Sequence, residues 1–201
     1  MNDRTLEQHA EPRTTLRRRL SEKLPEMLIE AGSVLLALLL AFAANSWHER
    51  SADLERAARA RAAIIAELNE NRVEVANSRK GVDGMQGELN EALHAAQPVH
   101  AMSLQVGLAL VSKAAWNTAQ ATQVVRNVDY AWIIKVAKVY ELQDLYVQAQ
   151  NRVVEKLSDI ASAKIETQAD VAKQMLGRVN AMADIGKGLD AAYADVLADS
   201  H

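Results

Sequence analysis

Few residues of this chain have the types and spacing that chemistry requires. Glu91 and His94 are three positions apart, so a helix would place a carboxylate and an imidazole on one face, where both can bind one metal ion. A di-iron site of this kind also needs a second Glu-x-x-His pair and two further glutamates, and residues 48–201 contain no second pair. His94 and His100 flank Pro98, which predicts a loop with solvent-exposed histidines. We therefore predict no metal site and no cofactor.

The signatures of common enzymes are also missing from the sequence. It has no cysteine, no Gly-x-Ser-x-Gly and no phosphate-binding loop, which leaves the usual nucleophile and nucleotide sites without their residues. The 23 basic and 26 acidic residues give a formal net charge of −3, without a broad basic face for nucleic acid. We predict that the protein is not an enzyme, has no catalytic residues and does not bind nucleic acid.

Aromatic residues gather in one third of the chain, at Trp116, Tyr130, Trp132, Tyr140 and Tyr146. Rings with polar tips between helices could line a ligand pocket, as in extracytoplasmic sensor bundles. Packing in a helical core needs the same residue types. We favour core packing, and the ligand pocket stays open as the alternative.

A long apolar run, residues 24–47, organises the chain. From Met27 to Ala44 the only charge is Glu30, and this length is just enough to cross a hydrocarbon core of about 30 Å. Trp47 follows at the position of an interfacial aromatic residue. The segment predicts a transmembrane helix, preceded by a basic cytoplasmic tail (residues 1–23) without periodic apolar positions and followed by an extracytoplasmic domain (residues 48–201).

The distribution of basic residues sets the expected orientation. More of them precede the apolar run than follow it, and the more basic flank stays in the cytoplasm. The residues compared are Arg13, Arg17, Arg18, Arg19 and Lys23 against Arg50, Arg56 and Arg59. We expect a single-pass protein of the bacterial inner membrane with its C-terminal domain in the periplasm. The alternative is a cleaved signal peptide ending near Ala41-Phe42-Ala43, which would export the same domain.

One face of the predicted membrane helix carries small and polar residues at steps of three and four. Small side chains allow close approach of a second helix, and polar groups can hydrogen-bond across the contact. This contact face consists of Glu30, Ser33, Ala37, Ala41 and Asn45, together with Ala44. Its expected partners are the lipid bilayer and either a second copy of the chain or another membrane protein. The alternative is that Glu30 reaches interfacial water and the face meets only lipid.

Beyond Trp47 the apolar positions recur at steps of three and four, and no alternating strand pattern occurs. The sequence predicts an all-α fold in which the membrane helix continues into a stalk helix, followed by an antiparallel bundle of four-helix type. The stalk stripe is expected to contain Leu54, Ala58, Arg61, Ile65, Leu68, Arg72 and Val75.

The expected helix boundaries follow from breakers and caps. The first helix runs from about Pro25 to about Ser78, because Gly81, Gly84 and Gly87 indicate a turn. A short helix follows from Glu88, and another is capped by Ser103 and includes Leu104, Leu108, Val111, Ala115 and Trp116. Asn127 or Asp129 caps a helix over 129–160, and the last covers 165–198, with Thr167-x-x-Asp170 as a capping box near the unmarked boundary at 158–168.

Several short motifs carry a resemblance. They are Glu30-Ala-Gly-Ser-Val-Leu-Leu-Ala-Leu, Asn45-Ser-Trp47-His-Glu49-Arg50, Ala66-Glu67-Leu68-x-Glu70-Asn71, Trp116-Asn-Thr118-Ala119, Asp129-Tyr130 and Tyr140-Glu141-Leu142-Gln143-x-x-Tyr146. In these the chain resembles a bacterial family of single-pass membrane proteins known as a domain of unknown function, with an Asn-x-Trp-x-Glu-Arg border after the membrane helix. It departs from the family at Ala121 and Thr122, where a glycine often follows the Trp-x-Thr-Ala segment. The resemblance implies topology and fold, and no activity.

These patterns together predict a membrane-anchored helical protein that acts as a structural or protein-interaction subunit. The alternative is an extracytoplasmic ligand-sensing bundle, which would signal through a partner because the short cytoplasmic tail has no room for an output domain.

Overall fold

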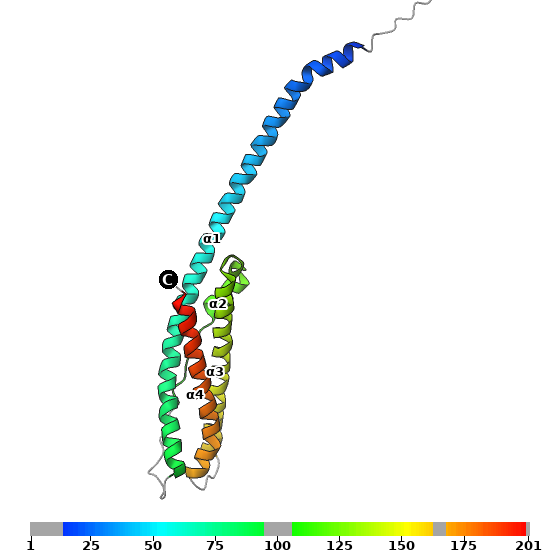
Figure 1. Cartoon of the computed structure of the whole chain (residues 1–201). Helices are drawn as coiled ribbons and strands as arrows, with labels where there is room; N and C mark the ends of the chain where they lie inside the picture. Colours follow the sequence, from blue (N-terminus) through cyan, green and yellow to red (C-terminus); the bar gives the residue numbers. More distant parts are fainter. Residues whose placement is uncertain (1–13, 95–105, 163–167, 200–201) are drawn as a thin grey trace, which may run out of the picture. The chain divides into compact units, whose positions relative to one another are not determined.

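In the computed structural model, the described residues are 14–94, 106–162 and 168–199, and they form helices without any strand (Figure 1). The elements are α1 (Thr14–His94), α2 (Ala114–Ala121), the 3-10 helix η1 (Val124–Asn127), α3 (Tyr130–Ser162) and α4 (Gln168–Ala198). The prediction of an all-α fold is therefore confirmed.

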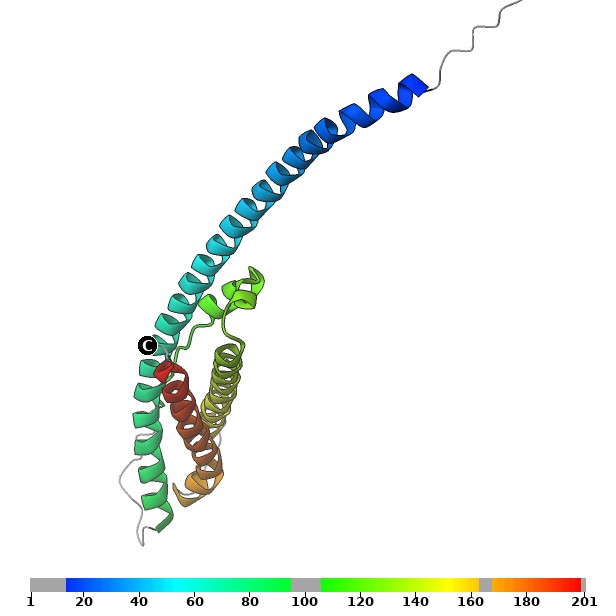
Figure 2. The same cartoon turned by 45° about the horizontal axis from the view of Figure 1, so that its top comes forward.

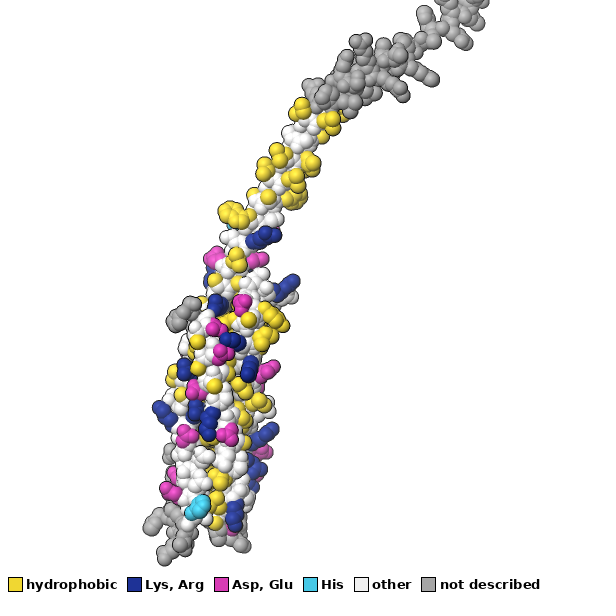
Figure 3. All heavy atoms as spheres, viewed as in Figure 1, with side chains coloured by type: hydrophobic (Ala, Val, Ile, Leu, Met, Phe, Trp, Pro, Cys, Tyr) yellow, Lys and Arg dark blue, Asp and Glu magenta, His cyan; other side chains and the backbone are white. Residues whose placement is uncertain are grey.

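Within α1 the chain divides into two units, residues 1–52 and 53–201. In the first unit, every described side chain from Met27 to Arg50 is exposed, including Leu36 at 59% and Phe42 at 67%. Figure 3 shows these apolar side chains around α1, and mixed charges over the bundle. Among the described residues, α1 is the one helix long and apolar enough to cross a membrane.

The start of α1 differs from the expectation. We expected a loose tail and a helix from about Pro25, whereas the helix begins at Thr14. Residues 16–24 consist mainly of leucine, arginine, glutamate and lysine, which all favour helix. Residues 1–13 of the predicted tail lie outside the described part.

The second unit is a bundle in which successive segments alternate in direction. The side chains of α1 and α3 meet in parallel order, Glu67 with Tyr140 and Ser78 with Tyr146. The helix α4 lies beside α3 in both views and is antiparallel to it, because Lys135 pairs with Asp195 and Asp199 (Figure 2). The segment from residue 106 to α2 returns between α1 and α3. The bundle is antiparallel, as expected, but its second member is largely extended chain.

The buried stripe of α1 is offset from the expected one. Its apolar members are Ala57, Ile64, Leu68, Val75, Val82, Met85, Leu89 and Ala92, and its polar members are Glu67, Asn71 and Ser78. Of the expected stripe, only Leu68 and Val75 are fully buried, whereas Leu54 is 64% exposed. The expectation was wrong for the other members, because the buried face of α1 also includes Glu67, Asn71 and Ser78, which the apolar spacing did not indicate.

The turn expected at Gly81, Gly84 and Gly87 does not form. The helix continues through all three glycines to His94, so the short helix expected from Glu88 is the end of α1. Each glycine lowers helix propensity by about 1 kcal/mol. Val82, Met85 and Leu89 are fully buried on the same stretch, and their burial outweighs that cost.

The helix expected after Ser103 is also wrong within the described residues. Residues 106–113 have no regular secondary structure, and helix resumes only at Ala114; this non-helical stretch is called the extended segment below. Ser103 and Leu104 lie outside the described part. A β-carbon on Gly107 would lie 3.3 Å from the Ser78 Cα, so this segment passes very close to the α1 backbone. The close approach and the polar partners described below favour extended chain here.

The last two helices agree with the sequence. The Asp129 side chain accepts a hydrogen bond from the Trp132 amide at 2.8 Å, which is the predicted cap of α3. The helix α3 ends at Ser162 and α4 begins at Gln168, inside the predicted boundary region. Thr167 of the predicted capping box lies outside the described residues.

Candidate functional site

The most unusual group in the core is the carboxylate of Glu67, which is only 7% exposed. Its Oε1 accepts a hydrogen bond from the Tyr140 hydroxyl at 2.6 Å, and its Oε2 accepts one from the Ser112 hydroxyl at 2.7 Å. The backbone amides of Ala115 and Trp116 donate to the same carboxylate at 3.0 and 3.4 Å. These amides belong to the first turn of α2, whose own N-cap residue, Lys113, makes no capping hydrogen bond with its side chain. Glu67 of α1 therefore caps α2 from another helix.

The hydrogen bonds keep Glu67 ionised despite its burial. Burial raises the pKa of the carboxyl, but the hydrogen bonds from Tyr140, Ala115, Ser112 and Trp116 together outweigh it, and the net pKa is lowered. The negative charge also lies at the positive end of the α2 dipole. Burial and the bond to Glu67 raise the pKa of Tyr140 well above its usual value.

Three more side chains, those of Asn71, Gln150 and Ser78, hold the extended segment 106–113 in place. Asn71 of α1 exchanges two hydrogen bonds of 2.7 Å with the backbone of Ser112. Gln150 of α3 accepts from the Ala109 amide at 2.7 Å. Ser78 donates to the Gly107 carbonyl and accepts from the Tyr146 hydroxyl at 3.0 Å. These side chains provide the backbone partners that a neighbouring strand would provide.

The aromatic cluster is mainly core. Trp116, Trp132, Tyr140 and Tyr146 are buried, and the rings of Trp116 and Tyr140 stack at 5.4 Å between centroids. This confirms the preferred reading of core packing for these four. Tyr130 is the exception, because 77% of it is exposed. None of these five aromatic residues lines the cleft described below.

The burial of polar residues in this core was not predicted, although several of them stand in the motifs quoted above; Ser78 and Gln150 do not. Glu67, Asn71, Gln143 and Tyr146 are all motif residues, and Gln143 donates to the hydroxyl of the buried Tyr193 at 2.8 Å. The available signal was a set of polar residues at heptad spacing, 67, 71 and 78. An exposed polar face has the same composition, so the sequence did not reveal their burial.

The network fixes structure and offers no reactive group. Every oxygen of Glu67 accepts hydrogen bonds, and the Tyr140 hydroxyl is engaged with it. Glu91 and His94 both lie on α1, so His94 ends a helix and does not lie in the expected loop. Both side chains are exposed, as expected for His94, and the His94 Nδ1 lies 2.8 Å from the Asn90 carbonyl. His100 lies outside the described residues. Within the described part of the chain, no three acidic or histidine side chains are grouped to hold a metal ion.

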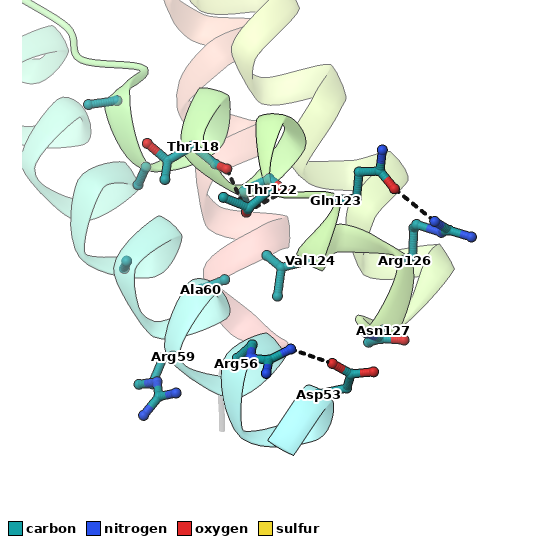
Figure 4. A pocket seen from close by; sticks show the side chains of 14 residues that line it. Asp53, Arg56, Arg59, Ala60, Thr118, Thr122, Gln123, Val124, Arg126 and Asn127 are labelled. Atoms are coloured by element: carbon teal, nitrogen blue, oxygen red, sulfur yellow. Dashed lines mark hydrogen bonds and ion pairs between the residues drawn. The ribbon is translucent and has the colours of Figure 1, made fainter. Parts of the chain in front are cut away.

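A cleft of about 860 Å³ lies beside this network, between α1 and the α2–η1 turn (Figure 4). Its apolar lining consists of Ala60, Ala63, Ala114, Ala115, Ala119 and Val124. Its polar lining consists of Thr118, Thr122, Gln123, Asn127, Asp53 and three arginines, Arg56, Arg59 and Arg126. The cleft thus combines an alanine-rich wall with an excess of positive charge.

The predicted membrane contact face is exposed along its whole length. The Ser33 hydroxyl donates to the Glu30 carbonyl at 2.8 Å, and the Asn45 amide donates to Glu49 at 2.9 Å. Both polar groups are therefore satisfied within the helix. Ala37, Ala41 and Ala44 leave the surface between them low enough for another helix to approach.

The extended segment also presents apolar side chains to solvent. Leu108 is 52% exposed and Leu110 is 77% exposed, while Ala109 between them is buried. These two leucines are called the leucine pair below.

Comparisons with known proteins add no relative: no protein-family model, no curated protein and no solved structure matches this chain.

Proposed function

We propose that this chain is a single-pass protein of the bacterial inner membrane whose periplasmic bundle, residues 48–201, is a structural or protein-interaction subunit without enzymatic activity. One observation carries the interaction role: buried polar side chains from two helices fix a non-helical segment that presents the leucine pair to solvent. Binding residues are commonly found on irregular segments held by a rigid scaffold. The proposed partner is another membrane protein or a second copy of the chain. We also propose that the chain belongs to the family with the Asn-x-Trp-x-Glu-Arg border that it resembles.

The topology is supported by the exposed apolar stretch of α1 and by the basic residues that precede it. A reporter that is active only in the periplasm, fused after His201, is expected to be active. Sequencing of the mature N-terminus is expected to find the chain uncleaved. An inactive reporter contradicts the orientation, and a chain beginning near Ala44 contradicts the anchor.

The interaction role is tested by photo-crosslinking in living cells. A photoreactive phenylalanine analogue replaces Leu110, and Glu155, an exposed residue of α3, is the matched control position. We expect one discrete crosslinked species from position 110, identified by mass spectrometry, and none from position 155. Leu110→Asp should abolish co-purification of that partner without changing the helix content, because the side chain is exposed. Equal crosslinking from both positions contradicts the proposal.

The second candidate function is a ligand-sensing bundle that signals through a partner. The cleft between α1 and the α2–η1 turn favours it, since its size falls in the range of small-molecule sites. A rise in the melting temperature of the protein with members of a metabolite library would support this candidate over the interaction role alone.

A further inference from the structure

We propose that the cleft between α1 and the α2–η1 turn binds a small organic anion, a carboxylate or phosphate joined to an apolar group, with Arg56 as the residue that pairs with its charge. This inference rests on the second candidate function and is independent of the interaction role. The ligand chemistry follows from the residues that line the cleft, from the ion pair of Arg56 and from the backbone conformation of the α2–η1 turn.

The charge of the cleft selects an anion. Three arginines and a single aspartate line it. Arg59 pairs with Glu55 outside the lining at 2.8 Å, so Arg56 and Arg126 stand against Asp53 and the charge is still positive. Guanidinium groups bind carboxylates and phosphates through paired hydrogen bonds. Figure 4 shows that Arg56 and Asp53 lie at the cleft near Val124, whereas the guanidinium groups of Arg59 and Arg126 point away from its centre. Arg56 is therefore the arginine placed to contact a ligand.

The ion pair that now occupies Arg56 is easily exchanged. The Nη1 of Arg56 lies 2.8 Å from Asp53, but the two side chains are 61% and 46% exposed and belong to one turn of α1. Such exposed pairs contribute little to stability, so a ligand anion with two oxygens can replace the aspartate at small cost. The Thr118 hydroxyl and the Asn127 amide form no hydrogen bond within the described residues and remain for polar ligand atoms.

The backbone at the cleft is held in an unusual conformation. Gln123 has a φ of 58°, the only positive φ among non-glycine residues of the described chain, and such strained residues occur often at ligand sites. The turn brings Val124 toward Ala60 of α1, so an apolar group in the cleft would meet methyl groups on both sides (Figure 4). Glu67 fixes the start of α2, so this wall is rigid before any ligand binds.

The test uses the full chain in phosphatidylcholine nanodiscs, with methyl-labelled alanine and valine observed by NMR. Phenyl phosphate is titrated, and phenol is the neutral comparison. We expect shifts of the Val124 and Ala60 methyl signals with phenyl phosphate and none with phenol. Arg56→Gln should weaken binding at least tenfold, while Arg178→Gln, an exposed arginine of α4 outside the cleft, should not change it. Ala63→Leu, which fills the cleft from an exposed position, should also weaken binding at least tenfold.

A second arm identifies the source of the anion. The same methyl signals are compared in nanodiscs with and without phosphatidylglycerol. Shifts with phosphatidylglycerol that disappear in Arg56→Gln support the anion site with a lipid headgroup as its ligand, whereas shifts with phenyl phosphate alone support a soluble ligand. Absence of shifts in both arms, equal shifts with phenol, or equal binding by Arg56→Gln and the unmodified chain overturns the proposal. None of these results affects the crosslinking test of the interaction role.

Discussion

Replacing Glu67 by alanine should destabilise the bundle more than any single loss on its surface. The change removes the cap of α2, which contributes about 0.5–2 kcal/mol in measured cases. It also leaves the buried Tyr140 hydroxyl without its acceptor, at a cost of about 1–3 kcal/mol. Together with the small cavity that remains, we expect the free energy of unfolding to fall by about 3–5 kcal/mol.

Two variants separate charge from packing. Glu67→Gln keeps the shape of the side chain but replaces one acceptor oxygen by an NH₂ group. That group cannot accept the hydrogen bonds that the carboxylate oxygen accepts, so the free energy of unfolding should fall by about 1–3 kcal/mol. Tyr140→Phe leaves the carboxylate with its other donors. A double-mutant cycle of Glu67→Ala with Tyr140→Phe should give a coupling of about 1.5–3 kcal/mol, as for hydrogen bonds to charged groups. Glu70→Ala, at an exposed position of the same helix, should change stability by less than about 0.5 kcal/mol.

The assay is equilibrium unfolding by urea of the full chain in detergent micelles. Tryptophan fluorescence is followed in a Trp47→Phe background, so that only the buried Trp116 and Trp132 report. The midpoint should move to lower urea concentration with an unchanged slope. If Glu67→Ala and Glu70→Ala shift the midpoint equally, the carboxylate does not hold the start of α2 and the account of the core is wrong.

Three further results are expected. Hydrogen bonding lowers the pKa of Glu67 below 4.5, the ordinary pKa of a glutamate. The contribution of this carboxylate to the stability of the fold is therefore present above pH 4.5 and is lost as the pH falls through the lowered pKa. Urea midpoints measured against pH should show this loss, and Glu67→Gln should lack it. Gly84→Ala should raise the free energy of unfolding by about 0.5–1 kcal/mol, since nothing lies near the added methyl. Gly186→Ala should lower it by about 1–3 kcal/mol, because a β-carbon there would lie 3.0 Å from a buried tyrosine ring; opposite shifts of the two melting temperatures would confirm this. Ala37→Leu with Ala41→Leu should reduce self-association in a membrane-helix assay, and unchanged association would show that the face meets lipid.

The sequence predicted the parts of this fold whose patterns are local. The helices α3 and α4 and the cap by Asp129 follow from apolar spacing and turn chemistry, and the structure agrees with them. The exposed stretch of α1 likewise agrees with the apolar run from Met27 to Ala44, in which Glu30 is the only charge.

The errors arose where distant partners decide the structure. Gly84 and Gly87 predicted a turn because the low helix propensity of glycine is a property of single residues. The helix forms nevertheless, because Val82 and Met85 on the same stretch pack against the rest of the bundle. Residues 106–113 read as helix because their partners, such as Asn71 and Gln150, are remote in sequence and polar.

The way the extended segment is held has a consequence for the order of folding. Asn71 binds Ser112 and Gln150 binds Ala109, and each pair is separated by 41 positions, in opposite directions along the chain. The segment therefore has its full set of partners only after α1 and α3 have assembled, so we expect it to join the bundle late and to leave it first during local opening. The amide of Ala109, whose acceptor is a side chain, should then exchange with deuterium through this local opening, earlier than the core amides of α3. The leucine pair would be displaced each time the segment opens. A partner that binds the pair would therefore shift the equilibrium of this local opening.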